Sequence, residues 1–242
     1  MAEKDSRLSV ARISLLVFGS GFCALVYQVA WLRLLRLIFG ASTPATAAVV
    51  AIFMGGIGAG SLILGPRADR QRSPLGFYSN LEFGIAVSAA LSPLLIQLVR
   101  WLYIAAGGSQ GLGLTLGTVM RIFLATLVLG VPTFLMGGTL PAITRAVERS
   151  EDQGRRLLGV LYGANTLGAV LGAVLTTFLT IEVLGIRRSI WVACLVNLLV
   201  ALWARTLARS QAQTAQRSSL AQGKSEAGTT QAAVSVDTAS PP

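Results

Sequence analysis

Residues 157–181 have the sequence LLGVLYGANTLGAVLGAVLTTFLTI, which contains no Asp, Glu, Lys or Arg. Because a transmembrane helix needs about 20 consecutive apolar residues, this stretch is long enough to cross a bilayer. Similar stretches recur along the chain, and only one of them holds an acid, Glu82: residues 13–32, 37–66, 73–99, 122–144 and 189–204. The sequence therefore predicts an all-α fold, a polytopic transmembrane helical bundle.

The composition agrees with an apolar environment around the fold. The chain has 53% hydrophobic and 12% charged residues, and its mean hydropathy is +0.68, whereas soluble domains carry about 25% charged residues. The net charge of +10 could suggest nucleic acid, but the basic residues lie at the expected helix ends with little aromatic interleaving. We therefore expect the lipid bilayer as a partner and no nucleic acid.

The sequence offers little for catalysis or metal binding. It has no His, which is the commonest general base and metal ligand. Its two cysteines, Cys23 and Cys194, lie inside predicted spans and are interpreted as small buried apolar residues. We therefore expect no metal, no cofactor and no catalytic residue in this chain.

Six spans are predicted, the first an uncleaved helix, at about residues 11–37, 44–65, 77–101, 117–146, 155–183 and 188–206. The Gly-rich, uncharged segment 107–117 is expected to be a flexible loop that divides the spans into three plus three. Residues 11–206 then form the transmembrane domain, after a short N-terminus at residues 1–10. Residues 207–242 are rich in Ser, Ala, Gln and Thr, so they are expected to form a disordered tail.

The basic residues predict the orientation in the membrane. Of the 20 Lys and Arg residues, 14 fall at the end of the spans that holds both termini, and six fall at the other end. Short cytoplasmic loops carry the excess of positive charge. The sequence therefore predicts a multi-pass protein of a bacterial-type inner membrane, with both termini in the cytoplasm.

Small residues recur one turn apart on two of the predicted helices. These candidate packing residues are Gly56, Gly60, Gly163, Gly168 and Gly172. Without side chains between them, two helix backbones can approach closely. Two interpretations stay open, which are static packing within the bundle and a sliding or rocking interface of a transporter.

Glu82 is the only acid deep in a predicted span. Because a charge in hydrocarbon is costly, this residue should face the bundle interior and be paired or protonated. Arg33 and Arg36 are its candidate partners, and they would meet it only if the helices shift. The acid is either a structural group or a cation or proton site.

Further polar residues lie near mid-span, namely Gln28, Asn165 and Asn197, with Tyr27 beside Gln28. Together with Glu82 they could line a polar cavity. The alternative is that they form hydrogen bonds between helices, which contribute only about 0.6 kcal/mol on average in membranes.

The loop after the second span contains Gly65, Asp69 and Arg70. This pattern resembles the G-x-x-x-D-R loop of major facilitator transporters, which lies between the same two helices. The six spans likewise resemble half of such a twelve-helix transporter. The alternative is a simple positively charged cytoplasmic loop.

Several segments resemble the membrane region of spermidine synthase-like membrane proteins. The resemblance covers about residues 15–205 and is carried by residues 21–33 (GFCALVYQVAWLR), 60–62, 68–70, 134–141 (FLMGGTLP) and 162–169 (YGANTLGA). In that family a transporter-like membrane part precedes a soluble aminopropyltransferase domain with a Rossmann-like fold. Relatives usually carry Glu where Gln28 stands, and this chain lacks the strand and Gly-rich loop of the catalytic domain, so the resemblance does not imply enzymatic activity for this chain alone.

Two functions are therefore expected. The first is a transporter-like module for a small cation, such as a polyamine, in which a homodimer would complete the pathway. The second is a membrane anchor or scaffold for a separately encoded, soluble aminopropyltransferase-like enzyme, which would dock on the cytoplasmic arginines.

Overall fold

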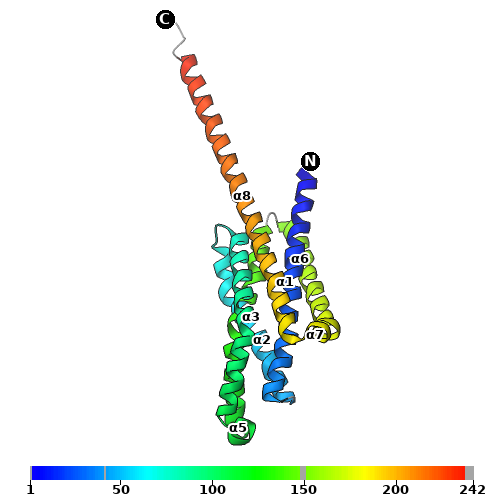
Figure 1. Ribbon diagram of the computed structural model, residues 1–242. Helices are drawn as coiled ribbons and strands as arrows, with labels where there is room; N and C mark the ends of the chain where they lie inside the picture. The colour runs from blue at the N-terminus through cyan, green and yellow to red at the C-terminus, as the bar shows by residue number, and fades with distance from the viewer. Residues whose placement is uncertain (1, 41, 148–150, 238–242) are drawn as a thin grey trace.

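The computed structural model describes residues 2–40, 42–147 and 151–237, and all the regular secondary structure in this part of the chain is helical (Figure 1). The elements in chain order are α1 Ala2–Phe39, α2 Thr43–Asp69, α3 Pro74–Ala105, α4 Gly108–Gly111, α5 Gly113–Val147, α6 Glu151–Leu175, a π-helical turn Thr176–Thr180, α7 Ile181–Leu184 and α8 Ile186–Asp237. Among them, six helices are long and apolar enough to cross a membrane. The expectation of an all-helical chain with six helices able to span a membrane is therefore confirmed.

Local signals explain where the helices begin and end. The Ser42 hydroxyl accepts a hydrogen bond from the Ala45 amide at 3.4 Å, and the Ser73 hydroxyl accepts one from the Gly76 amide at 3.3 Å, so each serine caps the helix that follows it. Gly185 separates α7 from α8 with a φ of 77°, a conformation that side chains disfavour. The chain reverses direction there with a single residue between two helices.

The helices pack in three main pairs. The most extensive contacts join α2 to α5, α1 to α6, and α3 to α8, and the α3–α5 and α1–α8 contacts come next. Because successive spans alternate in direction, α1 runs parallel to α6, and α2 runs parallel to α5 in the opposite sense. Both chain ends extend beyond the same end of the bundle (Figure 1).

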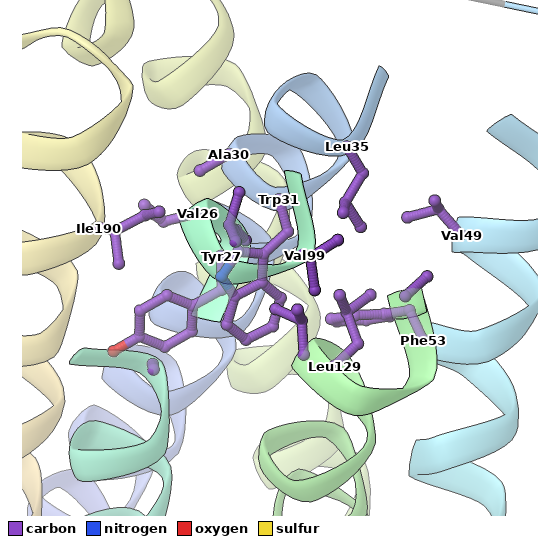
Figure 2. Close-up of a cluster of buried hydrophobic side chains, with 14 of the residues drawn as sticks. Val26, Tyr27, Ala30, Trp31, Leu35, Val49, Phe53, Val99, Leu129 and Ile190 are labelled. Carbon is purple, nitrogen blue, oxygen red and sulfur yellow. The ribbon is translucent and has the colours of Figure 1, made fainter. Parts of the chain in front are cut away.

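Two buried hydrophobic clusters fill the bundle. One surrounds Tyr27 and Trp31 of α1 and includes Phe53 of α2 and Leu129 of α5 (Figure 2). The other lies nearer the end of the bundle that carries the termini and includes Leu16. Many large apolar side chains on the outer faces remain exposed, as expected for helices that meet lipid.

The structure differs from the sequence prediction at the C-terminal tail. α8 continues to Asp237, where disorder was expected for residues 207–242, and residues 238–242 of this tail lie outside the described residues. The physical reason is that the transmembrane part supplies a helix nucleus, which is the costly step, and Ala and Gln extend a helix readily. The absence of an apolar face in this region excludes a packed core but does not exclude a helix.

The Gly-rich segment between the third and fourth spans is also more ordered than expected. It contains the short helix α4, and α5 begins directly after Leu112. Gly107, Gly108 and Gly113 have φ values of 92°, 57° and 66°. These glycines therefore form the turns at the two ends of α4.

Candidate functional site

Glu82 lies on the inward face of α3. Its exposed fraction is 0%, and neither of its carboxyl oxygens has a hydrogen-bond partner by distance and angle. Polar side chains around the carboxyl group come from three helices, namely Ser20 of α1, Tyr78 of α3 and Asn197 of α8. We call Ser20, Tyr78, Glu82 and Asn197 the Glu82 cluster. It places one acid, one amide and two hydroxyls together inside the bundle.

Hydrogen bonds to backbone carbonyls fix the helices that carry this cluster. The Asn197 side-chain amide donates to the carbonyl of Glu82 at 2.7 Å, and the Tyr78 hydroxyl donates to the carbonyl of Leu16 at 3.3 Å. One turn away, the Ser79 hydroxyl donates to the carbonyl of α8 residue Ala201 at 2.8 Å. α3 is therefore tied to both α1 and α8 at the level of the acid.

The aromatic pair of α1 lies next to this cluster. The rings of Tyr27 and Trp31 stack with centroids 5.3 Å apart, and the Trp31 indole donates to the Ser92 hydroxyl at 2.7 Å. The Tyr27 hydroxyl is buried, has no hydrogen-bond partner in the described part of the chain, and lies near the Cys194 thiol of α8. In Figure 2 both rings point into the apolar cluster.

The other predicted site residues lie elsewhere. Asn165 is half-buried on α6, with its backbone and side-chain oxygens against Gly21 of α1. Gln28 is half-buried on α1. The sequence prediction missed Ser20 and Tyr78, although Tyr78 lies four residues before Glu82 and therefore shares its helix face.

The arginines proposed as partners of Glu82 have other positions. Arg33 donates from its guanidinium to the backbone carbonyl of Thr177 at 3.3 Å, and Arg36 is exposed. Neither forms an ion pair with the acid in the described part of the chain, and a pairing that requires a helix shift stays a prediction. Thr177 belongs to the π-helical turn that follows α6.

Small residues bring α1 and α6 into close contact. A Cβ at Gly168 would collide with the backbone carbonyl of Phe18, and a Cβ at Gly172 would collide with that of Phe22. A Cβ at Gly21 would in turn collide with the carbonyl of Asn165, three residues before Gly168.

The contact between α2 and α5 has the same form. A Cβ at Gly60 would collide with the carbonyl of Phe134, and one at Gly137 would collide with the carbonyl of Ile57, three residues before Gly60. Gly56 packs in the same interface, against the Thr133 side chain.

Gly163 differs from the other candidate packing residues. No atom of the described chain comes within 4 Å of a Cβ built there. It therefore makes no close helix contact within this chain, although its sequence spacing is similar to that of Gly168.

The predicted loop motif lies at the end of α2. Asp69 and Arg70 are exposed, and Gly65 is half-buried, with Pro141 of α5 3.8 Å from a Cβ built at this glycine. The structure therefore leaves both charged side chains of the motif at the bundle surface.

Comparison with known proteins gives one group of relatives. The chain is 31% identical over 187 residues to a polyamine aminopropyltransferase of Mycobacterium tuberculosis, covering 74% of this chain and 32% of the relative. It is 27% identical over 208 residues to a polyamine aminopropyltransferase of Corynebacterium efficiens, covering 83% of this chain and 37% of the relative. The chain is similar to polyamine aminopropyltransferases.

The extent of the match limits what it carries over. The chain spans about a third of the length of these curated relatives. No family model matches it, and no solved structure matches it.

Proposed function

We propose that the six-helix bundle is a transporter-like membrane module for a small cation, and that Glu82 is the group that meets this cation. In this proposal the bundle consists of two inverted halves of three spans each, with α1, α2 and α3 in one half and α5, α6 and α8 in the other. Related halves of opposite orientation are a common construction of secondary transporters.

The observation that carries the proposal is the common register of the two glycine interfaces. A shift of 116 residues relates α1 to α5, so that Phe18 corresponds to Phe134 and Gly21 to Gly137. A shift of 108 residues relates α2 to α6, so that Ile57 corresponds to Asn165 and Gly60 to Gly168. The contacts Phe18–Gly168 and Gly21–Asn165 thereby become Phe134–Gly60 and Gly137–Ile57. Since the two helix pairs run in opposite directions, the relation is an inverted one.

The helix pairs support the same division. If the two halves are exchanged, α1 corresponds to α5, α2 to α6 and α3 to α8. The α1–α6 pair then becomes the α5–α2 pair, the α1–α8 pair becomes the α5–α3 pair, and the α3–α8 pair remains the same. All five of the most extensive helix contacts are accounted for in this way. The Glu82 cluster then lies where the third helices of the two halves meet, with α1 beside them.

The chemistry at Glu82 suits a small cation. The cluster supplies carboxyl, hydroxyl and amide oxygens, which are the groups that an ammonium ion can use as hydrogen-bond acceptors. An intramembrane acid is by default a candidate for a transport pathway. The name of the relatives, polyamine aminopropyltransferase, supports a polyamine as the cation.

Substitution of Glu82 tests this proposal in cells that lack their own polyamine uptake. We expect Glu82→Gln to reduce uptake of labelled spermidine by at least about tenfold, because a charge-assisted hydrogen bond contributes about 1.5–3 kcal/mol and a tenfold change corresponds to about 1.4 kcal/mol. The matched control is Glu182→Gln on α7, which removes an exposed acid at the other end of the bundle. Uptake that is unchanged in Glu82→Gln, at equal protein amounts in the membrane, would contradict the role of Glu82.

A second function is favoured by the complete burial of Glu82. A fully packed acid can serve as a structural group, and the bundle would then anchor an aminopropyltransferase at the cytoplasmic face. Purification in mild detergent followed by identification of co-purifying proteins separates the two functions. The anchor function would be favoured if an aminopropyltransferase co-purified in equal amount with this chain and if growth of the cells were normal without polyamine uptake.

A further inference from the structure

A groove lies between the beginning of α3 and the distal part of the α8 span, at the end of the bundle beyond which both termini extend. It encloses about 370 Å³. Gln71, Asn80 and Phe77 line one wall, and Arg205 and Arg209 line the other. The two arginines are four residues apart, so they lie on the same face of α8.

The groove is positively charged without compensation. The acids whose side chains the structure describes are Asp69, Glu82 and Glu182, and none of them lines it. Both arginines are exposed, and neither forms a hydrogen bond or ion pair within the described part of the chain. Their guanidinium donors are therefore available to an external acceptor.

Three arginines at the opposite end of the bundle have partners within the chain. Arg33 donates to the carbonyl of Thr177, and Arg121 donates to the Tyr103 hydroxyl at 2.9 Å. The Arg187 guanidinium nitrogens lie 2.9 and 3.1 Å from the Gln97 side-chain amide, whose oxygen accepts both hydrogen bonds when the amide is turned so that this oxygen faces Arg187. These three arginines therefore have hydrogen-bond acceptors within the chain, whereas Arg205 and Arg209 have none in its described part.

The position of the groove along the membrane-spanning helices indicates what surrounds it. Arg205 directly follows the uncharged run 189–204, and the opposite wall starts at the cap of α3. These are the positions where a span leaves the hydrocarbon and meets lipid headgroups. Basic pockets between transmembrane helices at this level are suited to anionic headgroups, and the planar guanidinium matches the geometry of a phosphate.

We propose that this groove binds the phosphate of an anionic membrane lipid, with Arg205 and Arg209 as the phosphate ligands. Asn80 and Gln71 supply further donors to the headgroup. Phe77 and the alanines of α8 between and beyond the arginines, Ala208 and Ala212, form the apolar part that the glycerol and first acyl carbons contact. The proposal does not depend on transport of a cation.

The test measures lipid retained by the purified full chain. The protein is extracted, exchanged into vesicles of phosphatidylcholine with a minor fraction of phosphatidylglycerol, and released for native mass spectrometry. We expect the wild type to retain phosphatidylglycerol, and the double variant Arg205→Gln/Arg209→Gln to retain it at least about tenfold less, since each charge-assisted contact contributes about 1.5–3 kcal/mol. The control Arg70→Gln/Arg72→Gln removes the same charge from exposed positions outside the groove and should retain lipid as the wild type does.

A lysine variant and a competition with inorganic phosphate complete the test. Arg205→Lys/Arg209→Lys keeps the charge and should restore part of the retention, which also guards against misfolding of the glutamine variant. Inorganic phosphate at millimolar concentration should not displace the lipid. Equal loss in both glutamine double variants, or displacement of the lipid by inorganic phosphate alone, would overturn the assignment.

Discussion

Gly60→Ala and Gly168→Ala are expected to destabilise the protein by a similar amount, about 1–3 kcal/mol each, because each added methyl group collides with a backbone carbonyl that cannot move without shifting a helix. The two glycines occupy equivalent places if the halves are related as proposed. Equal effects at both positions would support this relation. The protein is unfolded with a denaturing detergent, and the loss of helix content is measured.

Matched controls exist on the same two helices. Gly55 and Gly163 are related by the same shift of 108 residues, and no atom lies within 4 Å of a Cβ at either position. Gly55→Ala and Gly163→Ala should therefore be neutral or stabilising by up to about 1 kcal/mol, because Ala favours the helix over Gly. Destabilisation by the controls as large as at Gly60 and Gly168 would contradict the packing described here.

Trp31→Ala is expected to have the largest effect of any single substitution considered, a loss of about 3–5 kcal/mol. The side chain has an exposed fraction of 0%, stacks on Tyr27 and donates to Ser92. Its removal therefore leaves a cavity and takes away the donor to the Ser92 hydroxyl oxygen, although this hydroxyl still donates to the carbonyl of Ala89. Trp101→Ala removes the same side chain at 66% exposure and is the control.

Both tryptophan variants are measured by thermal unfolding in the same detergent. The account predicts a large decrease in melting temperature for Trp31→Ala and little change for Trp101→Ala. Similar melting temperatures for the two variants would show that the cluster around Tyr27 and Trp31 does not hold the bundle together.

The sequence was sufficient to predict the spans, because the membrane requires about 20 apolar residues regardless of the detailed fold. It also identified Glu82 as inward-facing, and the structure buries this residue completely. It could not predict the partners of Arg33, because its hydrogen bond to Thr177 depends on a local π-helical turn that leaves no clear sequence signal.

Glycine spacing was likewise an incomplete guide. Gly163 and Gly168 belong to the same small-residue pattern, yet only Gly168 meets another helix. Which face of α6 packs on α1 is decided by the arrangement of all the helices. The common register of the two interfaces is therefore visible only once the contacts Phe18–Gly168 and Phe134–Gly60 are known.

Transport by the purified protein is the central claim, and uptake of labelled spermidine into liposomes tests it most directly. Vesicles that hold the wild-type protein alone should accumulate spermidine faster than empty vesicles, and Trp101→Ala vesicles should behave like the wild type. An uptake rate equal to that of empty vesicles under both imposed voltage and imposed proton gradients would contradict the claim and leave the anchor as the function.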